Sequence, residues 1–327
     1  MAKLSVLDLA PVPAGSTIAD ALHNSRDLAR HCEALGYQRY WVAEHHNMPG
    51  IASAATSLLI SHIAAGTERI LVGAGGIMLP NHAPLVIAEQ FGTLAALYPD
   101  RIELGLGRAP GTDQATAYAL RRNLDSNVDQ FPRDVVELMH YFEPVSPGQK
   151  VRAVPGNNSN IPIWILGSSL FGAQLAAQLG LPYAFASHFA PGQLRDAVRV
   201  YRQQFKPSPQ LASPYVMAGF NVFAADTQEQ AHFLASSMQQ AFINLRRGTP
   251  DQLSPPRENY LNSLSPGERA LLADIMRCSA IGDPEMVARE VKNFINDYQV
   301  DELIVATQMY DHQARCRSYE ILARCMG

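Results

Sequence analysis

The sequence predicts a single (β/α)8 barrel, and three observations support this fold class. Short apolar runs alternate with helical patterns eight times, as they do where helices join parallel strands. The length of 327 residues suits one large α/β barrel. No linker divides the chain, so residues 1–327 are expected to form one domain. A doubly wound open sheet is the alternative, but the GxGxxG turn expected after its first strand is absent.

The expected strands are short runs of β-branched and aliphatic residues, the composition of strands buried in a parallel sheet. In chain order they are Leu4–Leu9, Tyr40–Ala43, Ile70–Ala74, Ile102–Leu106, Ile163–Leu166, Tyr183–Ala186, Tyr215–Ala224 and Glu302–Ala306. Pro11 and Pro13 stop the first strand, because proline cannot donate a hydrogen bond to a sheet. The seventh strand is long and apolar and is interrupted at Gly219.

The expected helices have apolar residues at three- and four-residue spacing and residues that favour helix ends. In chain order they are Ile18–Leu35, Ser53–Ala65, Pro84–Leu97, Phe131–Phe142, Ser169–Leu179, Gln193–Phe205, Thr227–Leu245, Glu268–Ser279, Pro284–Tyr298 and a C-terminal helix from Asp311. Thr17 and Asp283 are predicted N-caps, and Pro84 suits a first helical turn. Gly36 and Gly180 suit the left-handed position that ends a helix.

Three stretches lack a regular period. Ala109–Gln130 is interpreted as an excursion of loop and helix, and Pro144–Pro162 as irregular chain. Arg246–Gly267 is rich in proline, serine and asparagine. Together with the following helix it predicts an insertion between strands seven and eight, over residues 246–279, which is expected to act as a lid.

Composition narrows the function classes. The net charge of −4 gives no support to an electrostatic nucleic-acid binder. The four cysteines show no CxxC or Cys/His metal spacing, so no metal site is expected and a reducing compartment is the default. The N-terminal residues lack the pattern of a secretory signal, and no apolar run approaches the roughly 20 residues that span a bilayer. A cytoplasmic protein without membrane contact is therefore expected.

Glycines and an arginine gather where two expected strands end. Gly75 and Gly76 follow the third strand, and Gly105, Gly107 and Arg108 end the fourth. Ligand sites of parallel α/β folds lie at the carboxyl ends of strands. Glycine lets a ligand approach the backbone closely, and arginine can bind a phosphate or carboxylate.

Histidines occur at the same end of the expected barrel. Glu44, His45 and His46 directly follow the second strand, while His82 and His188 follow the third and sixth. A histidine there can exchange a proton near neutral pH, or it can be a loop residue held by backbone hydrogen bonds. Both interpretations stay open, although packing is favoured for the last two histidines. Trp41 and Trp164 lie within strands and are interpreted as barrel core.

Gly167, Ser168 and Ser169 follow the fifth strand and begin a helix. Hydroxyl groups and unpaired backbone N–H groups at a helix N-terminus can bind an anion, although serine is also a common N-cap. With Arg108, these residues are expected to hold one phosphate from two loops of the same rim.

The ordered set of these segments resembles the bacterial luciferase-like flavin monooxygenases. The segments that carry the resemblance are WVAEHHN, VGAGGIMLPNHAPLVIAEQF, DRIELGLGRAPG and PIWILGSSLFGAQLAAQLGLPYAFASHFAP. The resemblance runs through all eight strands, and it is closer to single-chain members of uncertain function than to the light-emitting subunits. It implies a (β/α)8 barrel that binds flavin mononucleotide (FMN) at the carboxyl ends of its strands.

The resemblance also implies roles for particular residues. Arg108 matches the arginine that reaches the flavin phosphate, and Ser168, Ser169 and Leu170 match the loop and helix start that hold it. Gly75 and Gly76 match a dipeptide under the isoalloxazine ring, where the family often has a cis peptide bond. His45 matches an active-site histidine, a candidate general base or proton donor, and Glu44 would orient it or fix the strand end.

Two departures bear on activity. Gly107 stands where the light-emitting subunits carry a reactive cysteine, and Ser168 stands where they carry an acidic residue. Bioluminescence is therefore not implied.

The resemblance implies an FMN-dependent monooxygenase that acts on a small organic substrate with O2 through a peroxyflavin intermediate. A separate NAD(P)H:flavin reductase would supply the reduced flavin. Hydride transfer with a deazaflavin, or flavin binding without catalysis, are the alternatives. A homodimer through the helices at residues 52–65 and 84–97 is also suggested, although these helices could simply face the barrel.

Overall fold

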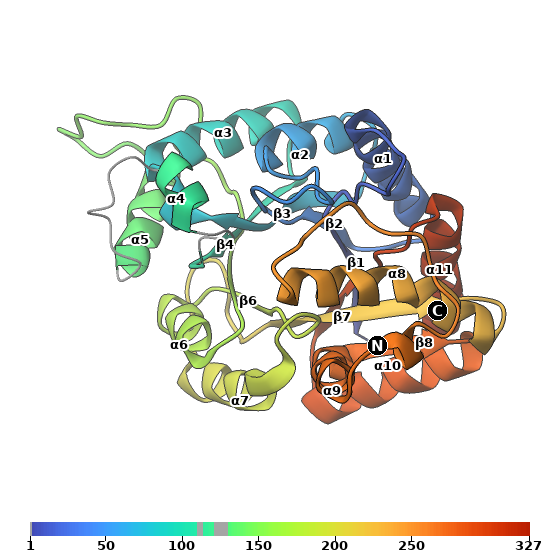
Figure 1. Cartoon of the computed structure of the whole chain (residues 1–327). Helices are drawn as coiled ribbons and strands as arrows, with labels where there is room; N and C mark the ends of the chain where they lie inside the picture. The colour runs from blue at the N-terminus through green and yellow to red at the C-terminus, as the bar shows by residue number, and fades with distance from the viewer. Residues whose placement is uncertain (1, 110–113, 121–129) are drawn as a thin grey trace.

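Eight parallel strands close into a barrel in this computed structural model, which describes residues 2–109, 114–120 and 130–327 (Figure 1). Strands β1 to β6 pair in sequence order, β6 pairs with β7, and β9 lies between β7 and β1. Their bounds are β1 Lys3–Asp8, β2 Arg39–Val42, β3 Leu71–Met78, β4 Ile102–Gly107, β5 Ile163–Gly167, β6 Tyr183–Phe185, β7 Val216–Ala224 and β9 Glu302–Ala306. The barrel prediction is confirmed, and the open sheet is excluded by the β6–β7 and β1–β9 pairings.

Helices surround the barrel, and most of them bury one face against the strands, whereas α9 packs on α8. They are α1 Ile18–Ala34, α2 Thr56–Ala64, α3 Pro84–Leu97, α4 Gln114–Leu120, α5 Phe131–Phe142, α6 Leu170–Leu179, α7 Leu194–Gln204, α8 Gln228–Arg246, α9 Pro266–Ile275, α10 Pro284–Tyr298 and α11 His312–Met326. Thr17 caps α1 by accepting from the backbone N–H of Asp20, and Gly180 ends α6 with a φ of 65°. No helix in these described ranges is long and apolar enough to cross a bilayer.

The largest departure from the predicted elements follows α9. The sequence predicted a helix over Glu268–Ser279, but α9 ends at Ile275 and Ser279–Gly282 forms a short strand, β8. This strand pairs in parallel with Asn221–Ala224 at the carboxyl end of β7. Tertiary pairing thus decides the conformation of a segment whose local pattern is ambiguous. The predicted excursion 109–130 contains α4, and its remaining part from 110–113 and 121–129 lies outside the described residues.

The barrel interior is filled in layers. Apolar side chains fill the middle, among them Leu7, Trp41, Trp164, Met217 and Ile304. The rings of Trp41 and Trp164 meet edge to face, with centroids 5.1 Å apart. Both tryptophans are therefore barrel core, as predicted.

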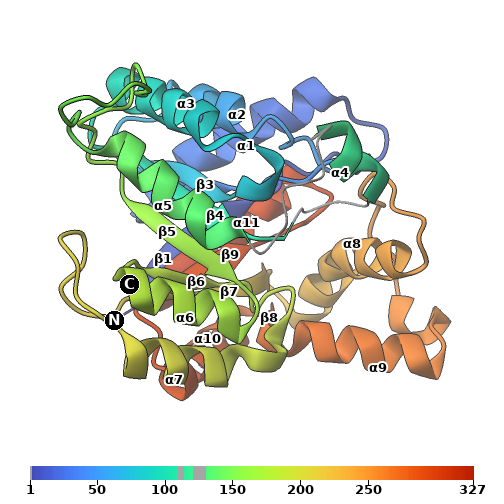
Figure 2. The same cartoon turned by 90° about the vertical axis from the view of Figure 1, so that its left-hand side faces the viewer.

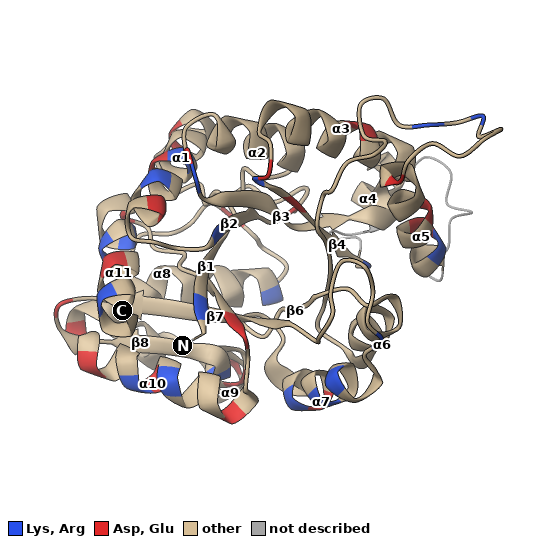
Figure 3. Ribbon diagram, turned by 180° about the vertical axis from the view of Figure 1, so that it is seen from behind, with Lys and Arg blue, Asp and Glu red and all other residues tan. Residues whose placement is uncertain are grey.

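A buried charged cluster closes the amino ends of the strands. The Nε of Arg39 lies 3.2 Å from Glu302 Oε1 and 3.4 Å from Glu103 Oε2. The guanidinium also lies 4.7 Å from the ring centroid of Trp164. With this end filled, the opposite, carboxyl end is the place where a ligand can enter. On the outside, both signs of charge are mixed along α1, α7 and α10 (Figure 3).

Candidate active site

The carboxyl ends of the strands, called the mouth here, bring the predicted site residues to one rim. Glu44 and His45 follow β2, Gly75 and Gly76 lie within β3, and Arg108 follows β4. Ser168 and Ser169 follow β5, and His188 follows β6. Adjacent strands of one parallel barrel thus supply all of them.

Glu44 is a buried carboxylate with an unusually complete set of partners. Its Oε1 lies 2.8 Å from His46 Nε2, 3.0 Å from His82 Nε2 and 3.2 Å from Asn81 Nδ2. Its Oε2 accepts from the backbone N–H of Met78 at 3.0 Å and also lies 3.0 Å from His82 Nε2. These bonds tie the end of β2 to the end of β3 and the turn after it.

The same bonds set the charge of Glu44. Burial acts to raise its pKa, but the hydrogen bond and charge of His82, together with hydrogen bonds from His46 and Met78, outweigh burial and lower it. The carboxylate is therefore ionised at neutral pH, and its hydrogen bonds join the end of β2 to the turn after β3. His82, interpreted as a packed loop residue, is a direct part of this cluster.

His188 is held by β7 in a way the sequence did not indicate. A Cβ on Gly219 would lie 2.1 Å from His188 Nδ1, so the ring occupies the space that a side chain would need. Asn221 Nδ2 donates to the His188 carbonyl at 2.8 Å, and Ser187 Oγ donates to the Gly219 carbonyl at 2.6 Å. The signal for this arrangement was the glycine in the apolar run of β7, since strand glycines often mark close approach.

The surroundings of His188 keep its imidazole neutral. Burial, reinforced by the charge of neighbouring His45, lowers the pKa of His188 to about 4. Its Nδ1 is buried and has no hydrogen-bond partner within the described residues. His188 lines a small cavity together with Trp41, Gly75 and Leu166. Leu7 and Ile304 of the barrel core and Phe185 at the end of β6 line it as well.

Gly75 and Gly76 form the floor of the mouth on β3. Their peptide bond is cis, and the pairing of β3 with β4 is shifted at this point. A Cβ on Gly75 would lie 2.8 Å from Leu7 Cδ1, and one on Gly76 would lie 2.6 Å from the Gly105 carbonyl oxygen. Both missing side chains would point into packed protein, so larger residues would not fit without shifting neighbours.

Arg108 lies at the N-terminus of α6. Its guanidinium stacks over the ring of Phe171, 4.0 Å from the centroid. Ser169 occupies the N-cap position of α6, but its side chain makes no capping hydrogen bond in the described structure. Ser168 is exposed, and Leu170 opens the helix. Through Phe171, Arg108 thus lies beside the first turn of α6, and an arginine near helix N–H groups is an arrangement suited to a phosphate.

Residues 247–259, called the strap here, connect α8 to the short helical segments before β8 (Figure 2). Leu253 exchanges backbone hydrogen bonds with the loop after β1, from its N–H to Val12 O and from Ala14 N to its own carbonyl, both at 2.9 Å. Gln240 of α8 donates to the Pro255 carbonyl at 2.8 Å. The strap therefore spans from α8 to the loop beyond β1, at the mouth.

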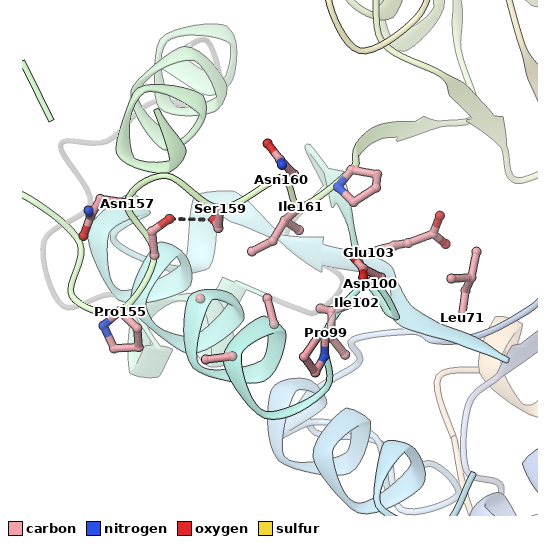
Figure 4. A pocket seen from close by; sticks show the side chains of 15 residues that line it. Leu71, Pro99, Asp100, Ile102, Glu103, Pro155, Asn157, Ser159, Asn160 and Ile161 are labelled. Atoms are coloured by element: carbon pink, nitrogen blue, oxygen red, sulfur yellow. Dashed lines mark hydrogen bonds between the residues drawn. The ribbon is translucent and has the colours of Figure 1, made fainter. Parts of the chain in front are cut away.

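Another cavity, of about 480 Å³, lies away from these residues (Figure 4). It is lined by α3 and residues 155–162, including Ser159, whose Oγ donates to the Gly156 carbonyl at 2.5 Å. Leu71 and Ile102, the first residues of β3 and β4, also line it. It is thus at the amino ends of the strands, where barrel enzymes do not place their chemistry, and it shares no residue with the mouth.

Comparison with known proteins agrees with this geometry. Residues 2–300 match the family described as luciferase-like monooxygenase. A relative of that name from Escherichia coli K12 is 54% identical over 317 residues, covering 97% of this chain and 95% of the relative. The N-acetyl-S-alkylcysteine monooxygenase of Bacillus subtilis is 32% identical, covering 99% and 98%. The crystal structure of apo-MsnO8 superposes with a TM-score of 0.88 at 34% identity, covering 100% and 98%. The chain belongs to the luciferase-like monooxygenase family.

Proposed function

We propose that this protein is a flavin-dependent monooxygenase that binds reduced FMN across the mouth and uses O2 to oxidise a small organic substrate. The observation that carries the proposal is the cluster of Arg108, the Ser169 hydroxyl and the N-terminus of α6. It supplies a cation, a hydroxyl and backbone N–H groups, which together match a phosphate monoester. Family membership supports a flavin as the molecule that carries this phosphate.

The remaining residues of the mouth fit the rest of the cofactor. A ring system that extends from the phosphate toward the barrel axis would meet the backbone of Gly75 and Gly76. When bound, the reduced flavin supplies the electrons for O2 activation. His45 is the proposed proton donor or base, and ionised Glu44 holds the adjacent loop in place. Neutral His188 lines the small cavity beside Gly75 without adding charge.

The insertion at residues 246–279 is proposed as the lid of this site. The strap already contacts the loop after β1, and the aromatic rings of Phe189 and Phe242 stack with centroids 6.3 Å apart between the loop after β6 and α8. Neither ring belongs to the insertion, but the rings and the strap together would cover the mouth and exclude water from a reactive centre.

Two partners belong to the same proposal. A separate NAD(P)H:flavin reductase would deliver the reduced cofactor. A second copy would cover α2 and α3, where Leu58, Val86 and Leu97 are 72%, 45% and 60% exposed. All four cysteines are thiols, which supports the cytoplasm as the setting.

The test is anaerobic titration of the purified protein with reduced FMN, with the deazaflavin F420 as competitor. Arg108→Ala should weaken FMN binding by about 10- to 100-fold, because a charge-assisted hydrogen bond to phosphate is lost. The matched control is Arg69→Ala, since Arg69 is 74% exposed at the amino end of β3. Admission of air with candidate thioethers and ketones then measures oxygenation. Preferential F420 binding, or equal FMN affinity in both variants, would refute the proposal.

A further inference from the structure

A group of metal-binding side chains lies on the outside of the barrel, between the helices α1 and α11. Asp27 projects from α1, and His312 and Cys316 project from the first turns of α11. Their ligand atoms, one from each residue, all lie within 4.8 Å of one another. The sequence showed no metal motif of the familiar kind, because the third residue comes from a helix nearly three hundred positions earlier.

The distances between the three ligand atoms are close to those found around a coordinated metal ion. His312 Nε2 lies 2.8 Å from Asp27 Oδ2 and 3.7 Å from Cys316 Sγ. Ligands about 2.0 to 2.3 Å from one tetrahedral zinc ion are themselves separated by roughly 3 to 4 Å. Small rotations of the Asp27 and His312 side chains would therefore make room for an ion.

Position on the helix explains why the residues meet. His312 and Cys316 are four residues apart, so their side chains lie on the same face of α11, one turn apart. Asp27 faces them because α1 packs beside α11, where Tyr37 OH also donates to the Tyr319 carbonyl at 2.8 Å. The two backbones are thus already fixed at the distance that the ligands require.

We propose that Asp27, His312 and Cys316 form a binding site for a zinc-like divalent cation that clamps α1 to α11. Thiolate and imidazole together select borderline-soft ions such as Zn²⁺ over Mg²⁺ or Ca²⁺, which prefer oxygen ligands. Water would complete the tetrahedron from the open side, where the Asp27 side chain is 62% exposed and that of His312 16% exposed.

The burial of the thiol agrees with a structural role for such an ion. Cys316 is buried, as structural rather than reactive cysteines are. A bound cation would take the place of the thiol proton. The site lies outside the mouth, so the proposal is independent of the proposed flavin chemistry.

The test uses Co²⁺ as a spectroscopic probe for Zn²⁺ in the full-length protein after treatment with a chelator. One equivalent of Co²⁺ should give a thiolate-to-cobalt charge-transfer band, which Zn²⁺ removes by displacement. The band should be lost in Cys316→Ser and kept in Cys325→Ser, a matched control because Cys325 lies on the same helix. Zn²⁺ at a hundredfold excess over its Kd should raise the Tm of the wild type by on the order of 5 °C, and not that of Cys316→Ser.

A second variant keeps the test decisive if Cys316→Ser does not fold. Asp27→Asn changes only an exposed side chain and should weaken Co²⁺ binding at least tenfold while leaving the metal-free Tm within about 2 °C. FMN affinity should be the same with and without Zn²⁺. The absence of a charge-transfer band in the wild type, or its persistence in Cys316→Ser, would overturn the proposal.

Discussion

Replacement of Glu44 by glutamine tests the claim that one buried carboxylate fixes the mouth. The change keeps the size of the side chain but replaces one oxygen by an NH2 group and removes the charge. In the wild type, one carboxylate oxygen faces His46 and Asn81 and the other faces Met78 N–H, with His82 reaching both. Whichever way the amide turns, its NH2 group must face at least one donor.

The expected cost follows from these contacts. One or two charge-assisted hydrogen bonds are lost, each worth about 1.5 to 3 kcal/mol, and a smaller cost of burying a neutral group offsets part of that loss. We expect a net loss of about 2 to 3 kcal/mol of unfolding free energy. For a chain of this size each kcal/mol lowers Tm by on the order of 2 °C, so Tm should fall by roughly 4 to 6 °C.

The pH dependence gives the sharper assay. Folding lowers the pKa of Glu44, so the unfolded state binds more protons near the unfolded pKa of about 4.3. The contribution of ionised Glu44 to the free energy of unfolding is therefore complete above that pH, and it is lost as pH falls through the pKa of Glu44 in the folded state. Denaturant unfolding of wild type and Glu44→Gln should be measured between pH 7 and pH 3. The difference between their unfolding free energies should become smaller as pH falls. Exposed Glu258→Gln is the control. A stability gap below 0.5 kcal/mol, or one that is constant with pH, would refute the reasoning.

Three further outcomes are expected. Gly219→Ala should displace the His188 ring, because the new Cβ would lie 2.1 Å from its Nδ1. In an oxygenation assay this variant should lower kcat/KM at least tenfold. Gly192→Ala is the control and should leave kcat/KM unchanged, because the space around Gly192 is open. The His188 signal in an NMR titration should show no inflection near pH 6.5, since its pKa lies at about 4, and an inflection there would contradict its described environment. Arg315→Met should cost about 3 to 5 kcal/mol by urea unfolding, because it leaves buried Asp8, 2.6 Å from Arg315 Nη2, without its counter-charge, whereas Arg277→Met on the surface should cost little.

Local patterns in the sequence were sufficient for the barrel. The eight barrel strands and most helices are marked by their own period and end residues, as Thr17 and Gly180 show, so alternation alone predicts the fold class. Strand β8 was missed because the four residues Ser279–Gly282 are too few to show a period and become a strand only by pairing with β7. Local sequence patterns do not predict a pairing between strands so far apart in the chain.

The sequence predicted where the candidate site lies better than it predicted the contacts between the side chains there. Arg108 and Ser169 follow the adjacent strands β4 and β5, so the strand order alone places both on one rim. The bond between Glu44 and His82 depends on the turn after β3, and the space for His188 depends on Gly219, which is on another strand. Such contacts depend on the directions in which individual side chains point, and the hydrophobic periodicity of a sequence does not predict these directions. The roles of Gly75, Gly76 and His45 in flavin chemistry remain predictions from family resemblance.

The pairing of β1 with β9 has a consequence for synthesis on the ribosome. Lys3 pairs with Glu302 and Val6 with Val305, so the first strand to emerge waits for one of the last before its second edge is covered. During that time β1 presents an open edge, which is a template for association with other chains. Closure at such long sequence separation is also intrinsically slow. Nascent chains that stop before β9 should therefore be the ones that bind chaperones, whereas release of α11 should end that dependence.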